Sequence, residues 1–372
     1  MAPPSVTVYT LRGGFLAGDV FYGTVELNFR ALQEEQVEEV HVKLRGYAAT
    51  SIFRNNQRAR QIVELVRLDQ SLWTRGTLYP PPGSDVLSIP FRFLLPAELP
   101  PSFIFRHPVA DAYIRYHVEA VGVRPGLLKM NKRCLRPFIV FTPDEAGSLV
   151  KPELQIGQLW TGAWLTATEH KRIRRAFWGD YGDVQLEFKR PSAVVYPVLS
   201  DIPFVITIAT ISKPIKLEDG KKPWPSPPLE PSAVHLELKH TVWVQAGIWD
   251  QTSTQTLTSL GGMGGSIGSV SIETHEDEWL PDDEDKKKGR WRKKVSFSSS
   301  FKLKHTPTFN FPFITLEYFL HVKVHFGGLL NSLSIDIPTT VGSGMTPLTG
   351  DVDLDNQRDE ALPRFEDLDL PP

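Results

Sequence analysis

The sequence predicts an all-β protein made of two β-sandwiches in tandem, and three observations lead to this prediction. Short runs in which apolar and polar side chains alternate recur along most of the chain, and this period of two is typical of half-buried strands. The chain also contains 31 prolines and 27 glycines, residues that mark strand ends and edges. Its 372 residues suffice for two separate cores, since a domain takes about 150 residues.

The alternation locates individual strands. In 24–29 the apolar residues Val25 and Leu27 are expected to point inward, and in 40–46 three apolar residues oppose His41, Lys43 and Arg45. One apolar and one polar face per strand indicate antiparallel sheets packed face to face. The segment 32–39 runs directly into a strand and is expected to form a turn or a single helical turn. Further strands are expected at 89–95, 113–120, 204–209, 234–238 and 320–326.

Composition divides the chain into regions. We expect a first sandwich over 1–145 and a second over 146–342, with the linker between them inside 143–157. Residues 250–300 are expected to form a flexible insertion, because a glycine-rich run (261–265) precedes an acidic run (276–285) and a basic run (286–294). The Asp-rich end, 343–372, lacks a periodic apolar face and is expected to be a disordered tail.

The bulk properties favour a cytoplasmic protein. The net charge of −2 gives no whole-molecule field that would attract nucleic acid, and a single cysteine, Cys134, excludes an intramolecular disulfide. The chain begins without the pattern of a signal peptide, holds no apolar run near 18 residues and has no Asn-x-Ser/Thr acceptor. We therefore expect a cytoplasmic protein, with recruitment to the plasma membrane or endosomes left open.

The sequence contains no convincing catalytic, metal or cofactor site. Ser266 stands in a Gly-x-Ser-x-Gly match, but that motif needs a strand–turn–helix context and here lies in a glycine-rich run. Cys134 has basic neighbours, yet it occupies a strand-like run and is interpreted as a small core residue. His321 and His325 share a strand face, where spacing supplies no third metal ligand. We expect no enzyme and no cofactor.

Two segments are candidates for binding. A basic-aromatic stretch could meet anionic lipid headgroups or an acidic or phosphorylated partner, or could be an edge strand protected by charge. The end of the tail alternates acidic and apolar residues and could dock through a few anchors, or be plain solvated disorder. The basic stretch comprises Lys171, Arg172, Arg174, Arg175, Phe177 and Trp178, and the tail anchors are Phe365, Leu368 and Leu370.

Four patterned segments in order resemble the arrestin family, in particular the α-arrestins. They are 18–27 (GDVFYGTVEL), 40–46 (VHVKLRG), 91–103 (FRFLLPAELPPSF) and 113–121 (YIRYHVEAV). The match covers about 5–142, and a weaker one covers 197–341. The resemblance implies two immunoglobulin-like β-sandwiches in an arrestin-like arrangement. The residues that carry the fold signature are Gly18, Asp19, Gly23, Gly46, Pro96, Pro100, Pro101 and Phe103.

The resemblance also implies a function. Proteins of this family are adaptors that bind plasma-membrane transporters or receptors and bring a ubiquitin ligase to them, so that the cargo is endocytosed. Their ligase contact is a Pro-Pro-x-Tyr motif, which is absent here, so the ligase contact is open and could be indirect. The strand 6–12 also lacks the paired lysines that sense phosphate in visual and β-arrestins. Two alternatives remain: a retromer-type sorting scaffold, and a carbohydrate-binding sandwich, which the nine tryptophans suggest.

Overall fold

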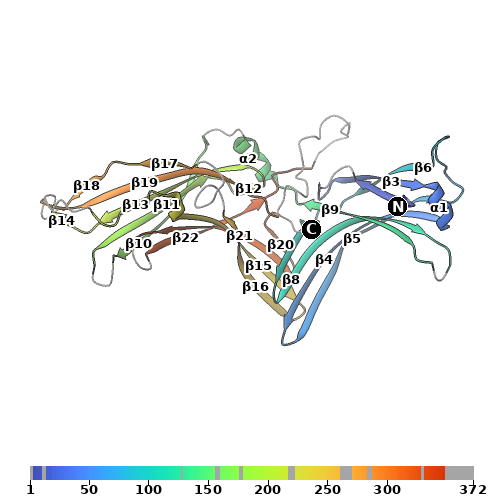
Figure 1. Ribbon diagram of the computed structural model, residues 1–372, viewed down its shortest axis with the longest axis horizontal. Coiled ribbons are helices and arrows are strands. Elements are labelled where there is room, and N and C mark those ends of the chain that lie inside the picture. Colours follow the sequence, from blue (N-terminus) through green and yellow to red (C-terminus); the bar gives the residue numbers. More distant parts are fainter. Residues whose placement is uncertain are drawn as a thin grey trace.

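A computed structural model describes residues 3–10, 14–126, 129–155, 160–175, 179–216, 223–259, 270–282, 287–327 and 331–347 (Figure 1). Most of these residues lie in strands, so the prediction of an all-β fold is confirmed. The α-helices within the described ranges are α1 (Phe29–Glu35) and α2 (Glu145–Gln155). Neither these nor any other described helix is long and apolar enough to cross a bilayer.

Two sheets face each other in the first part of the chain (Figure 1). Their facing sides hold apolar side chains such as Phe21, Leu44 and Val118, all fully buried. One sheet has the order β1 (Val6–Thr10), β3 (Val20–Asn28), β6 (Val86–Leu94). The other has the order β2 (Gly14–Leu16), β9 (Lys132–Phe141), β8 (Ala110–Val123), β4 (Glu39–Arg54), β5 (Gln57–Thr74), with β7 (Phe103–His107) beside β8.

The second part of the chain also consists of two main sheets. One sheet has the order β10 (Trp164–Arg174), β11 (Tyr181–Pro191), β13 (Asp201–Ser212), β19 (Lys288–Lys302), β14 (Ile215–Lys216), with β17 (Ser271–Thr274) and β18 (Glu278–Pro281) also on β19. The other has the order β16 (Trp249–Ser259), β15 (Val234–Ala246), β21 (Ile314–His325), β20 (Phe309–Phe311), with β22 (Ser332–Thr339) on β21. A short parallel pair joins β12 (Tyr196–Pro197) to β23 (Val341–Gly342).

Helix α1 is longer than the single turn predicted over 32–39, and it begins three residues earlier. The reason is Asn28, whose side chain accepts a hydrogen bond from the Ala31 amide at 3.0 Å and so caps the first turn. Phe29 and Leu32 then bury one side of the helix. The helix ends at Gln36, which takes a left-handed conformation with φ 57°.

The flexible insertion predicted over 250–300 is wrong for the part that the structure describes. Strand β19 contains most of the basic run and is a central strand of its sheet, paired with β13 and β14 on one side and with β17 and β18 on the other. The acidic run supplies its partners, since Arg292 lies 3.5 Å from Glu278 and Lys293 lies 3.1 Å from Asp277. Blocks of opposite charge thus pair across adjacent strands. Residues 260–269 and 283–286 lie outside the described ranges.

Two hairpin ends meet where the two parts of the chain join. In Figure 1 the β4–β5 hairpin extends away from its sheet and its lower end meets the β15–β16 hairpin. Thr50 donates a hydrogen bond to the Gln245 carbonyl at 2.6 Å, and Arg54 donates to the Asp250 carbonyl at 3.1 Å. The Phe105 ring also packs at 6.0 Å from the buried His240 ring. The junction therefore contains both polar and apolar contacts.

A carboxylate holds the other side of the junction. Asp144 accepts from the Gly147 amide at 2.8 Å, which caps α2, and from the Gly344 amide at 2.9 Å. Its own amide donates to the Met345 carbonyl at 2.7 Å. A side chain at Gly147 or at Gly342 would collide with this carboxylate. The end of β9 is in this way tied both to α2 and to the segment that follows β23.

We expect Gly23→Ala to destabilise the fold, because a Cβ there would collide with the Phe91 ring and lie 2.8 Å from the Tyr9 carbonyl oxygen. Overpacking of this kind costs about 1–3 kcal/mol of unfolding free energy. Gly327→Ala is the matched control, since a Cβ at that position meets no atom within 4 Å. Denaturant unfolding of both variants is the measurement. Equal stability of the two would contradict the packing described for β3 and β6.

Candidate docking face

The segment that carries the resemblance is buried between the two parts of the chain. The Tyr116 hydroxyl donates to the Pro100 carbonyl at 2.7 Å, and the Tyr116 ring lies over Gly46, where a Cβ would come within 2.5 Å of it. Phe103 is only 4% exposed and its ring stacks edge-on with that of Phe309 at 5.2 Å. The prediction that Phe103 is packed at the end of the sandwich is confirmed.

Neighbouring hydrogen bonds extend this arrangement. The Ser102 amide donates to the Val140 carbonyl at 2.8 Å, and the Thr306 hydroxyl donates to the Ser102 carbonyl at 3.1 Å. Pro101 is buried as well. The residues 100–103 thus connect β9 of the first part with the 303–309 segment of the second, and the buried Pro100, Pro101 and Phe103 are unavailable to a partner.

The remaining signature residues form a turn. Gly18 has φ +87°, a conformation that other residues rarely adopt, and its amide donates to the Pro96 carbonyl at 3.2 Å. The Leu95 amide donates to the Asp19 carbonyl at 2.9 Å. The turn before β3 is thereby joined to the end of β6. These residues maintain the fold and offer no docking group.

The structure does not bring the predicted basic stretch together as one surface. Ile173 points into the core, so the alternation along β10 places Lys171 on the inner side and Arg172 and Arg174 on the outer side. Arg172 is also paired with Asp183 at 2.8 and 3.4 Å, whereas the Lys171 ammonium donates to the Ser332 carbonyl at 3.1 Å. Arg175 follows the strand in a turn. Phe177 and Trp178 lie outside the described residues.

Other candidates are placed as follows. The tail anchors Phe365, Leu368 and Leu370, and the Gly-x-Ser-x-Gly match around Ser266, lie outside the described ranges. Cys134 is half-buried on β9 and packs against the core. In the part of the chain that the structure describes, no group of three or more His, Cys, Asp or Glu side chains is arranged to hold a metal ion.

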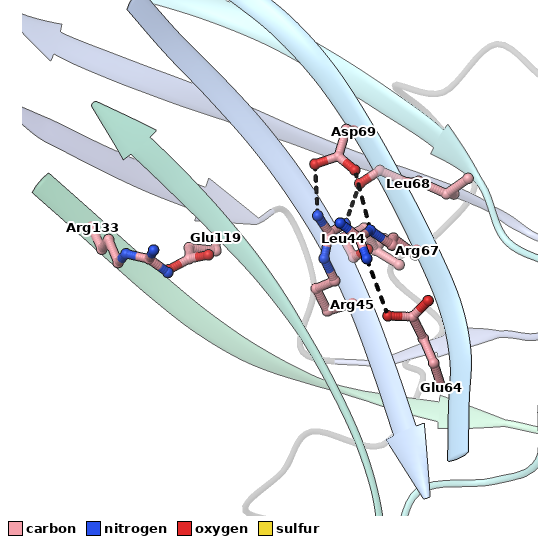
Figure 2. Close-up of polar contacts among 8 residues, drawn as sticks. All are labelled: Leu44, Arg45, Glu64, Arg67, Leu68, Asp69, Glu119 and Arg133. Atoms are coloured by element: carbon pink, nitrogen blue, oxygen red, sulfur yellow. Dashed lines mark hydrogen bonds and ion pairs between the residues drawn. The ribbon is translucent and has the colours of Figure 1, made fainter. Parts of the chain in front are cut away.

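The outer side of the six-stranded sheet in the first part of the chain carries a polar surface that the sequence did not single out. We call it the charged face. Its centre is the Arg45 guanidinium, which donates to the Leu68 carbonyl at 2.8 Å, to the Leu44 carbonyl at 3.0 Å and to the Asp69 carboxylate at 2.6 Å (Figure 2). The charged face comprises Lys43, Arg45 and Tyr47 on β4, Glu64, Arg67 and Asp69 on β5, Tyr113, Arg115, His117 and Glu119 on β8, and Arg133 on β9.

The ion pairs around Arg45 differ in length. Arg67 makes only long contacts, 3.9 Å to Glu64 and 4.0 Å to Asp69, while Arg133 reaches Glu119 at 3.0 Å (Figure 2). The hydrogen bond from Arg45, assisted by its charge, lowers the pKa of Asp69 below its ordinary value. Burial, together with the charge of Arg45, lowers the pKa of His117, so its ring is neutral at pH 7. The cations on the face outnumber the anions.

An aromatic group adjoins the charges at the end of the face nearest the hairpin. The Tyr47 and Tyr113 rings meet edge-on at 5.8 Å, and the Arg115 guanidinium lies 5.2 Å from the centre of the Tyr113 ring. Arg60 adds a hydrogen bond to the Tyr113 hydroxyl at 3.3 Å. Tyrosine and arginine are among the residues enriched at protein interfaces. The arrangement suits an extended polar segment with an excess of acidic groups.

The signal for the charged face was present in the sequence. His41, Lys43 and Arg45 alternate with three apolar residues and were expected on a polar side. Their partners Asp69, Glu119 and Arg133 come from other strands, and only the register of β4 with β5 and β8 brings them together. Comparison of the sequence with models of protein families and with curated proteins finds no match.

We expect Arg45→Ala to lower the unfolding free energy by about 1–2 kcal/mol, because charge-assisted hydrogen bonds to the Leu68 carbonyl and to Asp69 are lost. Arg67→Ala, which removes only long and exposed pairs, should change it by less than about 0.5 kcal/mol. Urea unfolding compares the two variants.

The same variants test the electrostatics. A carboxyl group with a lowered pKa stabilises the folded state above its unfolded-state pKa and loses that contribution as the pH falls. The pKa of Asp69 should therefore rise in Arg45→Ala, and the decline of stability on acidification should become shallower. NMR titration of Asp69 measures this directly, and an unchanged pKa would show that Arg45 is not its cause.

Proposed function

We propose that this protein is an arrestin-like adaptor in membrane-protein trafficking, which binds a transporter or receptor and links it to ubiquitination and endocytosis. The observation that carries the proposal is the burial of residues 100–103, the most family-like part of the sequence, between two successive pairs of sheets. Residues 100–103 therefore help to join the two parts of the chain, as expected for the arrangement that the resemblance implies. The resemblance supplies the class of function, and no catalytic step is part of it.

The charged face is the proposed cargo-binding surface. It combines exposed cations with a tyrosine pair, and neither Arg115 nor Lys43 makes an ion pair within the described residues. Cytoplasmic segments of membrane proteins are often extended and polar, and such segments fit a flat sheet face better than a deep pocket. Complementary charge would select those rich in Asp, Glu or phosphorylated residues.

Proximity labelling in the native host tests the proposal. The wild-type protein should label transporters or receptors together with a ubiquitin ligase or its adaptors. A Lys43→Glu, Arg115→Glu variant should lose the membrane cargo, whereas Arg92→Glu, an exposed change on β6 in the opposite sheet, should keep it. Labelling without any membrane protein, or cargo that survives the double variant, would count against the proposal.

The same experiment separates the main alternative. A labelled set of sorting-complex subunits without a ubiquitin ligase would favour a retromer-type sorting scaffold instead. A carbohydrate-binding sandwich has weaker support, because Trp164 is the one exposed tryptophan among those that the structure describes. Binding on a glycan array would nevertheless favour it.

The chain 1–372 should not bind an isolated WW domain through a Pro-Pro-x-Tyr mode. The nearest match, residues 100–103, ends in Phe103 instead of tyrosine and is buried against Phe309. Titration against a panel of WW domains is the measurement. Micromolar binding that survives deletion of 343–372 but is lost in Phe103→Ala, with the variant shown to be folded, would mean that the fold itself presents this segment.

A further inference from the structure

Three cross-strand rows of side chains lie on the outer side of the five-stranded sheet in the second part of the chain, which contains β15, β21 and β22. In the first row Glu237, His321 and Asp336 are direct neighbours on β15, β21 and β22. His321 lies between the two acids, with its Nδ1 2.5 Å from the Asp336 carboxylate. Glu237 is also 3.7 Å from Lys239. This row therefore holds two carboxylates, with the Lys239 ammonium beside one of them.

The next two rows hold no acidic side chain. His235, Lys323 and Ser334 are neighbours in register, and His325 lies opposite Ser332 in the row beyond. The His235 and His325 rings meet edge-on at 5.2 Å, beside Lys323. None of these three basic side chains makes an ion pair within the described part of the chain. We call His235, Lys323 and His325 the histidine–lysine cluster.

A cation from the other sheet extends this cluster. Strand β10 lies beside β22 (Figure 1), and the Lys171 ammonium reaches the Ser332 carbonyl at 3.1 Å, next to His325 in the register. Asn331 binds the Arg174 carbonyl at 2.7 Å and holds the two edges together. The groups that face the cluster are thus Lys171 from β10, His321 on β21, Glu237 and Lys239 from β15, and Asp336 with two serines from β22.

We propose that the histidine–lysine cluster is a binding site for anionic phospholipid headgroups on a membrane surface, and that its affinity rises as the pH falls. Lys171 and Lys323 supply permanent charge, and the two serine hydroxyls can donate hydrogen bonds to phosphate oxygens. The cations lie on a sheet face and along its edge, so they are spread over a surface as a bilayer contact requires. Free phosphate would need donors that converge on one point.

His325, packed against His235, supplies the pH dependence. Burial lowers the pKa of His325, and the charge of Lys323 and the neighbouring His235 lower it further. Its ring is therefore neutral at pH 7, and protonation without a ligand would add charge to an uncompensated cluster. A bound anion removes that penalty, so binding and proton uptake favour each other.

Vesicle binding by the full chain tests the proposal at about pH 7.5 and about pH 5.5. Phosphatidylserine keeps its charge between these values, so a change in affinity reports on the protein. We expect binding to phosphatidylcholine vesicles that contain phosphatidylserine to be about tenfold tighter at the lower pH and to weaken with added salt. Vesicles of phosphatidylcholine alone should not bind.

Variants assign the effect to the cluster. His235→Asn with His325→Asn should remove most of the pH dependence and leave binding at neutral pH in place. Lys323→Gln should weaken binding at both pH values and keep their ratio. His41→Asn, on the first six-stranded sheet, is the matched control and should change neither. The melting temperature of each variant shows that it is folded.

Two results would overturn the proposal. One is the same pH dependence in the histidine double variant as in the wild type. The other is pH-dependent binding of inorganic phosphate without binding to vesicles, which would assign the cluster to a soluble anion. The measurement involves no cargo, so its outcome is independent of the proposed adaptor function.

Discussion

The carboxylate of Asp144 is the point on which the arrangement of the two parts depends. It is the N-terminal cap of α2 and at the same time accepts the Gly344 amide, about 200 residues away in sequence. Such a group can occupy this place only because Gly147 and Gly342 leave room for it. Leu16, Ile139 and Phe141 form a small apolar cluster beside it, against which Met345 packs. Without this contact, the two parts would be held only by the contacts elsewhere in the junction, such as those of Thr50, Arg54 and Phe103.

A second set of contacts, on the opposite side of the junction, removes the remaining freedom. Thr50 and Arg54 bind carbonyls of the β15–β16 hairpin, and Phe103 packs on Phe309. Two separated attachments resist rotation in a way that one cannot. The charged face lies on the same sheet as Thr50 and Arg54, so a partner bound there meets a surface of fixed orientation. This rigidity suits a scaffold that must present one protein to another.

Local patterns in the sequence predicted the strands well, and they failed where partners are distant. The alternation in 40–46 and 91–95 indicated the correct faces, because burial on one side of a sheet imposes a period of two. The charge blocks in 276–294 have the composition of a disordered segment, and only the pairing of β18 with β19 shows that each block neutralises the other. The prediction that the basic stretch forms one surface fails because a strand separates residues that are neighbours in sequence. Lys171 and Arg172 are adjacent in sequence, but a strand directs them to opposite sides, and the histidine–lysine cluster arises from strands that the sequence gives no means of aligning.

Strand β4 carries two surfaces at once. Its first half exposes Lys43 and Arg45 on one side, and its second half places Thr50 on the other side against the Gln245 carbonyl. Because neighbouring residues in a strand point in opposite directions, inserting or deleting one residue between these halves would turn one surface over relative to the other. Evolution can therefore vary the side chains of this strand but not its length. The hairpin end has no more freedom: Asn55 and Asn56 form its left-handed turn with φ of 49° and 60°, and the adjacent Arg54 binds the Asp250 carbonyl, so a longer turn would alter the junction.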